Sequence, residues 1–116
     1  SFALIPHILI DNAVKYSRRG ENTNVLFEEN TNSIIMKIKS IGPLILPEEK
    51  DLIFEKFVKG KNSSAYSSEG SGIGLYMAKN IVEKHDGKIF VESTVVSNDK
   101  NSQIAETTFV IEMPKS

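Results

Sequence analysis

The stretch SEGSGIGLYMAKNIVEKHDGKI, residues 68–89, places three glycines directly ahead of an amphipathic segment. The glycines are Gly70, Gly72 and Gly74, and the segment predicts a helix over about Ile73–Lys84. The start of a helix presents unpaired N–H groups and partial positive charge, and glycines let these donors approach a ligand closely. The combination is typical of an anion site, most often for phosphate. A flexible helix entry that binds nothing is the alternative that these residues alone leave open.

The order and spacing of the glycines disfavour two common nucleotide-binding folds. The dinucleotide fingerprint G-x-G-x-x-G follows a strand within a βαβ unit, whereas here a polar loop precedes G-x-G-x-G. The Walker pattern G-x-x-x-x-G-K-[ST] does not occur in the chain.

The other segments alternate between helical and strand patterns. In chain order they predict a helix over about Phe2–Tyr16, a hairpin of Asn24–Glu29 and Ser33–Ile41, a short helix from Pro47 to Gly60, a loop over Lys61–Gly70, and strands over Lys88–Val96 and Ile104–Met113. This order predicts an α+β fold, a two-layer sandwich in which a mostly antiparallel sheet has helices on one face. The side chains of helix 73–84 expected to be buried are Ile73, Tyr76, Met77, Ile81 and Val82.

The composition fits one globular domain and gives no sign of a strongly charged partner. The 116 residues have a net charge of −1, so nothing points to nucleic acid or to an anionic membrane. The chain has no cysteine, which excludes a disulfide framework and a thiolate metal site and is compatible with a reducing compartment. No apolar run reaches the roughly 20 residues that a membrane span needs. Because the sequence begins within a helical pattern, we expect a fragment of a longer protein.

Asn12 lies on the apolar stripe of the first predicted helix, one turn after Ile8. A buried primary amide needs hydrogen-bond partners, so it is either satisfied internally or directed at a ligand or metal. Lys15 and Tyr16 follow three and four residues later, on neighbouring parts of the same helix face. Asp11 and Lys15 also fit a solvated ion pair.

Four stretches resemble, in order and spacing, the motifs of one family. HILIDNAVKYS is similar to the N box of the GHKL ATPase superfamily, DLIFEKFVKG to its F box, EGSGIGLYMAKNIVEKHDGKI to its second glycine box, and TTFVIEMP to its closing strand. The resemblance is specifically to sensor histidine kinases and covers nearly the whole chain. It implies that residues 1–116 form an ATP-binding catalytic domain of the Bergerat type that lacks the first elements of the family domain.

The resemblance implies roles for the residues at matching positions. Asn12 would hold Mg²⁺ against the phosphates of ATP, and Lys15 and Tyr16 would contact the phosphates and the nucleotide, which makes Asn12 and Lys15 the expected catalytic residues. The full set of expected nucleotide-binding residues is Asn12, Lys15, Tyr16, Ser40, Gly42, Lys59, Gly70, Gly72, Gly74, Leu75 and Thr107.

The segment Lys59–Gly72 would form a lid over ATP, and Phe54 and Phe57 would anchor its near end in the core. A lid rich in serine and glycine can order over a bound triphosphate. Lys59 sits where the family often has a basic residue that reaches phosphate; a charge that offsets a helix dipole is the alternative for this lysine.

Some positions depart from the family pattern, whose first glycine box reads D-x-G-x-G-I. In the aligned SIGPLI, Ser40 replaces the aspartate that accepts a hydrogen bond from the adenine amino group, and Leu44 replaces a glycine. Ile8 replaces a polar residue one turn before Asn12, and Glu106 replaces a glycine ahead of the closing Thr-Thr-Phe. Loss of one charge-assisted hydrogen bond costs roughly 1.5–3 kcal/mol, or about ten- to 150-fold in affinity.

The phosphate end of the expected site is therefore kept, and its adenine end is altered. We expect weaker but useful ATP binding. The alternative is a nucleotide-free or weakly binding scaffold that keeps the fold for contacts with a partner.

As a kinase domain, the chain would position Mg-ATP for phosphoryl transfer to a histidine on a separate dimerisation domain, with a response regulator receiver domain as a further partner. The resemblance implies a cytoplasmic location, either in a cytoplasmic protein or in the cytoplasmic portion of a membrane-bound sensor. It implies neither a nucleic acid partner nor direct contact of this domain with the membrane. His7 and His85 lack the setting of a phosphoacceptor, and His85 is expected to cap its helix. An ATP-driven clamp is disfavoured because Ile8 cannot act as the general base.

Overall fold

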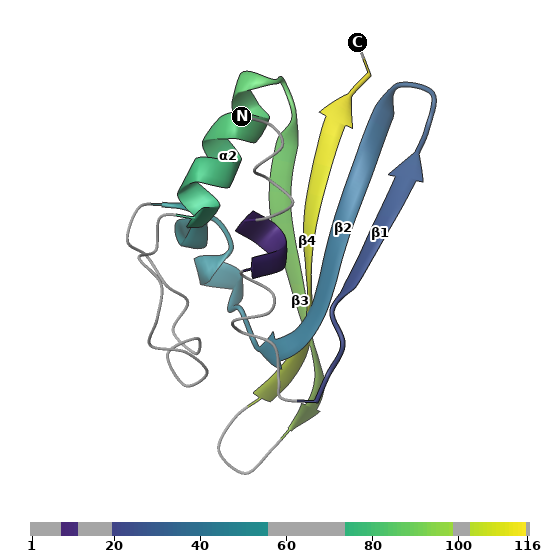
Figure 1. Cartoon of the computed structure of the whole chain (residues 1–116). Helices are drawn as coiled ribbons and strands as arrows, with labels where there is room; N and C mark the ends of the chain where they lie inside the picture. The colour runs from purple at the N-terminus through teal and green to yellow at the C-terminus, as the bar shows by residue number, and fades with distance from the viewer. Residues whose placement is uncertain (1–7, 12–19, 56–73, 99–102, 116) are drawn as a thin grey trace.

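The computed structural model describes residues 8–11, 20–55, 74–98 and 103–115 (Figure 1). Residues 8–11 are helical. The elements that follow are strands β1 (Asn24–Glu29) and β2 (Ser33–Pro43), 3-10 helices η1 (Pro47–Glu49) and η2 (Leu52–Phe54), helix α2 (Gly74–Lys84), and strands β3 (Lys88–Asn98) and β4 (Gln103–Pro114).

The described strands form one four-stranded sheet in the order β1-β2-β4-β3, and each neighbouring pair is antiparallel. Strand β4 therefore lies between β2 and β3, although it is last in the chain. The described helices lie on one face of this sheet (Figure 1). The predicted α+β sandwich with a mostly antiparallel sheet is confirmed.

The β1–β2 hairpin follows the bounds that the alternating pattern predicts, with β2 two residues longer at its end. Its turn is closed by the side chain of Asn30, whose Oδ1 atom accepts hydrogen bonds from the N–H groups of Asn32 at 2.9 Å and Ser33 at 2.7 Å. An asparagine that satisfies the backbone in this way stabilises a tight turn without help from the rest of the fold.

The space between sheet and helices is filled by apolar side chains from every layer. The buried members of this core are Leu9, Met36, Ile38, Ile53, Phe54, Val82, Val91, Phe109 and Ile111. The rings of Phe54 and Phe109 meet edge to face, with centroids 6.2 Å apart. Residues as distant in sequence as Leu9 and Ile111 thus share one core, so the fold depends on long-range packing.

The described part of helix α2 starts at Gly74, and Ile73, at the predicted start, lies outside the described residues. Val82 of the predicted buried stripe is buried, but the stripe as a whole is shifted. Ala78 and Val82 are buried, whereas Met77 is 42% exposed, so the prediction of Met77 in the buried stripe is wrong. Leu75 and Ile81 pack partly against the core. The face of Leu75, Ala78 and Val82, at spacings of three and four, is the one that meets the sheet.

The end of α2 shows the predicted cap. The Nδ1 atom of His85 lies 2.8 Å from the carbonyl oxygen of Ile81, so a proton on this nitrogen donates to one of the last carbonyls of the helix. The chain then turns at Asp86, whose φ of 60° is in the left-handed region, and the N–H of Gly87 donates to the carbonyl of Val82 at 2.9 Å. This arrangement satisfies carbonyls that a helix end leaves without partners.

The segment predicted as a single short helix from Pro47 instead forms two 3-10 turns in its described part. The first turn is closed by the Leu46 N–H, which donates to the Glu49 side chain at 3.0 Å, and by the Glu49 N–H, which donates to the Leu46 carbonyl at 2.9 Å. Such turns stay short, because the hydrogen-bond geometry of a 3-10 helix is poorer than that of an α-helix. Phe54 is buried as predicted, and Phe57 lies outside the described residues.

Candidate functional site

The structure describes some of the expected site residues. Those that lie in described segments are Ser40, Gly42, Gly74, Leu75 and Thr107. Those that lie outside them are Asn12, Lys15, Tyr16, Lys59, Gly70 and Gly72. The expected metal ligand and lid thus stay predictions.

Two of the described residues are direct neighbours in the sheet. Ser40 on β2 pairs with Thr107 on β4, and Thr107 pairs in turn with Ser93 on β3. The Thr107 Oγ1 and Ser93 Oγ atoms lie 2.8 Å apart, and Ser93 Oγ accepts the N–H of Ile45 at 3.1 Å. We call Ser40, Thr107 and Ser93 the hydroxyl row. Sequence reasoning missed Ser93, which only the register of the strands reveals.

The hydroxyl row lies on the helix-facing side of the sheet. Ser40 and Thr107 are 9% and 5% exposed, and they are the buried polar residues of the described chain. The next pair along the strands on this side is Gly42 opposite Ala105. This end of the sheet therefore offers small side chains and hydroxyl groups, where the other end offers large apolar ones.

Glu106, one of the departures from the family pattern, points away from this end of the site. Glu106 is on the opposite side of β4 from Thr107, because successive residues of a strand alternate between faces. Its carboxylate lies 3.8 Å from the Nζ atom of Lys39, and both side chains are more than a third exposed. A glutamate in place of the family's glycine therefore leaves the helix-facing side of the row unchanged.

The helical segment 8–11 touches the start of α2. Leu9 is fully buried in the core and fixes this segment. A Cβ atom placed on Gly74 would lie 3.4 Å from the Cγ2 atom of Ile8, so the Ile8 side chain lies against the start of α2. Leu75, the next residue of α2, packs partly against the same core. The N-box segment and the second glycine box, far apart in the sequence, thus meet.

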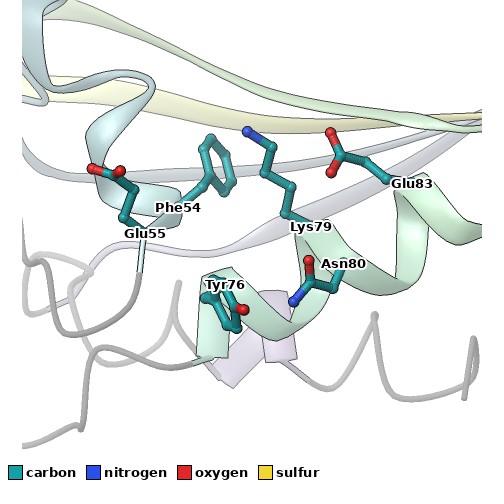
Figure 2. Close-up of a pocket in the computed structure, with 6 residues that line it drawn as sticks. All are labelled: Phe54, Glu55, Tyr76, Lys79, Asn80 and Glu83. Carbon is teal, nitrogen blue, oxygen red and sulfur yellow. The ribbon is translucent and has the colours of Figure 1, made fainter.

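A second feature lies on the flank of α2, where a groove of about 400 Å³ opens between this helix and η2. Figure 2 shows the lining residues, which are Phe54, Glu55, Tyr76, Lys79, Asn80 and Glu83. The Nζ atom of Lys79 lies 5.8 Å from the centroid of the Phe54 ring, a cation–π distance. Of the expected nucleotide-binding residues that the structure describes, none lines this groove.

The groove has a mixed chemical character. Glu55 and Glu83 place negative charge on its rim and Lys79 positive charge, around an aromatic floor. The charged side chains of the lining therefore carry a net negative charge. Sequence reasoning missed this groove: it assigned Tyr76 to the buried stripe of the helix, whereas Tyr76 is half-buried and lines the groove with Lys79 and Glu83.

The described residues offer neither a metal site nor a membrane span. No group of three or more His, Asp or Glu side chains in these segments is placed to hold a metal ion. Within the same segments, no helix is long and apolar enough to cross a membrane.

Comparison with known proteins gives a consistent family. Residues 4–116 match the family described as histidine kinase-, DNA gyrase B-, and HSP90-like ATPase. Sensor protein SrrB of Staphylococcus aureus (strain NCTC 8325 / PS 47) is 35% identical over 107 residues, which span 92% of this chain and 17% of SrrB. The chain thus corresponds to a small part of this relative's length.

Solved structures show the same similarity in three dimensions. A mycobacterial sensor histidine kinase, MprB, superposes with a TM-score of 0.80 and 29% identity over 95% of this chain and 69% of the MprB chain. The nucleotide-free catalytic domain of histidine kinase ThkA gives a TM-score of 0.72 and 26% identity over 96% of this chain and 65% of its own. The structure of ThkA in complex with response regulator protein TrrA gives a TM-score of 0.70 and 24% identity, over 97% of this chain and 28% of the ThkA chain. This similarity shows a common fold.

Proposed function

The chain belongs to the family of histidine kinase-, DNA gyrase B- and HSP90-like ATPases, and from this we propose that residues 1–116 act as the ATP-binding catalytic domain of a two-component sensor histidine kinase. The domain would position Mg-ATP so that the terminal phosphoryl group passes to a histidine on a separate dimerisation domain. We propose a cytoplasmic location. ThkA forms a complex with response regulator protein TrrA, and by analogy we propose a response regulator receiver domain as a further partner of this chain.

One observation supports this proposal most directly, the contact between segment 8–11 and the start of α2. Asn12 follows this segment at once, and the glycine-rich stretch precedes Gly74 at once. Side chains and backbone N–H groups from the two motifs then need to extend only a short way to reach one ligand. The partial positive charge at the start of α2 favours an anion there.

Each motif would have its own task in phosphoryl transfer. Asn12 would hold a magnesium ion, which neutralises phosphate charge when bound. Lys15 and Lys59 would offset the charge of the terminal phosphate, and the backbone at Gly70 and Gly72 would donate hydrogen bonds to the phosphates. The domain would therefore contribute positioning and charge neutralisation, and the nucleophile would come from the dimerisation domain.

The other end of the nucleotide would meet the sheet. We place the purine base over Ser40 and Thr107, with Gly42 leaving room for it and Leu75 of α2 at its side. The position of both hydroxyls on the helix-facing side, beside the small Gly42 and Ala105, supports this placement.

The groove on the flank of α2 suits the domain that bears the histidine. Helix α2 has one end at the proposed phosphate site, so a helix seated in the groove would lie beside it. Its exposed acidic and basic groups can pair with complementary charges on the partner.

Titration of the chain with ATP tests the proposal. We expect calorimetry to show binding that depends on magnesium, and thermal unfolding to shift upwards with ATP; at a hundred times the Kd the native state gains about 2.7 kcal/mol. Asn12→Ala should abolish the magnesium dependence. The matched control is Asn98→Ala, at the exposed end of β3, which should bind as the unchanged chain does.

A nucleotide-free scaffold is the second candidate, and the replacement of an aspartate by Ser40 favours it. This candidate predicts no heat and no thermal shift at millimolar Mg-ATP. That outcome would overturn the kinase proposal.

A further inference from the structure

We propose that the base end of this site does not distinguish a 6-amino purine from a 6-oxo purine, so that the chain binds inosine triphosphate about as well as ATP. The inference rests on the proposed function, because it concerns the specificity of the same site. It follows from the hydrogen-bonding roles of the hydroxyl row, whose members can each donate or accept.

The hydrogen-bond direction within the row is not fixed. Ser93 Oγ accepts the N–H of Ile45 with one lone pair and keeps a second lone pair and its own proton. Either oxygen of the 2.8 Å contact between Ser93 and Thr107 can therefore be the donor. If Ser93 donates its proton to Thr107, the hydroxyl proton of Thr107 is free to donate to a ligand. If Thr107 donates its proton to Ser93, Thr107 can only accept a hydrogen bond from the ligand.

Ser40 adds a third group of the same kind. A serine hydroxyl donates or accepts as its partner requires, whereas an ionised aspartate only accepts. A carboxylate at this position would favour the adenine amino group, a donor, and repel a 6-oxo group, an acceptor. The row can meet either group by rotating its protons.

The surroundings of the row do not restore a fixed polarity. Its nearest neighbours on the helix-facing side of the same three strands are Ile38, Gly42, Val91, Val95, Ala105 and Phe109. None of them is ionisable or has a polar side chain. The nearby carboxylate of Glu106 is on the outer face and is paired there with Lys39. Among the described residues of these strands, nothing beside the row selects an acceptor over a donor.

The inference is tested by calorimetric titration of the 116-residue chain with ATP and, separately, inosine triphosphate, both with magnesium. Inosine triphosphate is the appropriate probe because it differs from ATP only at the purine edge: an oxygen replaces the 6-amino group, and N1 has a proton. We expect the two dissociation constants of the unchanged chain to agree within about tenfold, less than the selectivity that one charge-assisted hydrogen bond confers.

Ser40→Asp should then create selectivity. Its ratio of dissociation constants, inosine triphosphate over ATP, should rise by roughly tenfold or more above that of the unchanged chain. Ser97→Asp makes the same substitution at an exposed position of β3 and should leave the ratio unchanged.

The possible outcomes separate the two proposals. If ATP binds and inosine triphosphate binds more than about tenfold more weakly, the inference is overturned and the proposed function stands. If neither nucleotide binds, the proposed function fails, and the inference fails with it. The ratio of the two dissociation constants for the unchanged chain tests the inference even if Ser40→Asp does not fold.

Discussion

The two ends of the helix-facing side of the sheet are built from the same strands but differ in chemistry. At one end β2 and β4 contribute Met36, Ile38, Phe109 and Ile111, all at most 8% exposed. At the other end they contribute Ser40, Gly42, Ala105 and Thr107. The change takes place in a single step of the register, between the pair Ile38–Phe109 and the pair Ser40–Thr107.

The difference separates two uses of buried surface. Large apolar side chains stabilise the fold by about 0.8 kcal/mol for each buried CH₂ group. Small side chains and hydroxyls add little of this, since a buried hydroxyl must first regain the hydrogen bonds that it loses to water. We therefore expect substitutions at the apolar end to change stability, and substitutions at the hydroxyl end to change ligand binding.

The largest effect is expected from Phe109→Ala. This ring is 4% exposed and packs edge to face on Phe54, so its loss leaves a cavity in the core and should lower the free energy of unfolding by about 3–5 kcal/mol. Urea denaturation measures the change. Phe90→Ala is the matched control, because Phe90 is 42% exposed on the other face of the sheet, and it should cost about 1 kcal/mol or less. Equal costs for the two variants would contradict the assignment of the core to the helix-facing side.

Gly87→Ala should have the next largest effect, a loss of about 1–3 kcal/mol from overpacking. A Cβ atom at Gly87 would lie 2.8 Å from the backbone oxygen of Glu112 and 2.9 Å from Val82 Cγ1, and it would also clash with Met113 Sδ. The flexible Met113 side chain can move away, but the Glu112 backbone cannot do so without disturbing β4.

The control for this glycine is the same substitution at the other end of α2. Among the described residues, a Cβ atom at position 74 meets only the Ile8 Cγ2 atom, at 3.4 Å. Alanine also favours the helix, so the unfolding free energy of Gly74→Ala should be unchanged or slightly raised. A destabilisation by Gly74→Ala as large as that by Gly87→Ala would show that the binding end is packed as tightly as the core.

Much of this fold could be predicted because its signals are local. The alternation of β1 and β2 and the Asn30 turn fix the hairpin from residues close in sequence. The place of β4 between β2 and β3 could not be predicted, because it depends on pairing between distant segments. The 3-10 turns η1 and η2 were predicted as one helix for a similar reason: the start signal at Pro47 was correct, but propagation of a helix depends on packing.

The site was predictable only in part. Family motifs identified Ser40 and Thr107 separately, yet the sequence does not indicate that they are cross-strand neighbours or that Ser93 completes the row. Strand register determines this, and register depends on the whole sheet. The error at Met77 arose similarly, since helical spacing gives two adjacent stripes on α2 and only the sheet decides which one is buried.

Thr107→Val tests the hydroxyl end of the comparison. The two side chains have nearly the same shape, so the variant removes one hydrogen bond to Ser93, which keeps the Ile45 N–H as a partner. We expect a loss of about 1 kcal/mol in unfolding free energy, together with weaker Mg-ATP binding in calorimetry. A loss as large as that for Phe109→Ala, with binding unchanged, would assign Thr107 to the core and remove the distinction between the two ends.

The smallest effect is expected on the outer face of the sheet, which belongs to neither end. There the carboxylate of Glu28 lies 2.7 Å from Lys37 Nζ. The hydrogen bond to Glu28 and the negative charge of Glu28 raise the pKa of Lys37 above its ordinary 10.5, and the charge of Glu92 adds to this effect. Burial has a smaller effect in the opposite direction. A raised pKa means that the folded state holds this proton more tightly, so the contribution to stability is complete below pH 10.5 and disappears as the pH rises through the raised pKa.

Lys37→Gln should therefore lower stability slightly at pH 9. The difference in unfolding free energy between this variant and the unchanged chain should disappear at higher pH, as paired urea denaturation curves would measure. Lys84→Gln, which removes a charge from the last turn of α2, is the control for the general effect of charge. Two results would contradict this: a difference in unfolding free energy that grows with pH, or a change in Mg-ATP binding by Lys37→Gln. Either result would mean that the outer face is coupled to the helix-facing side, and that the contrast between core and binding end is not confined to that side of the sheet.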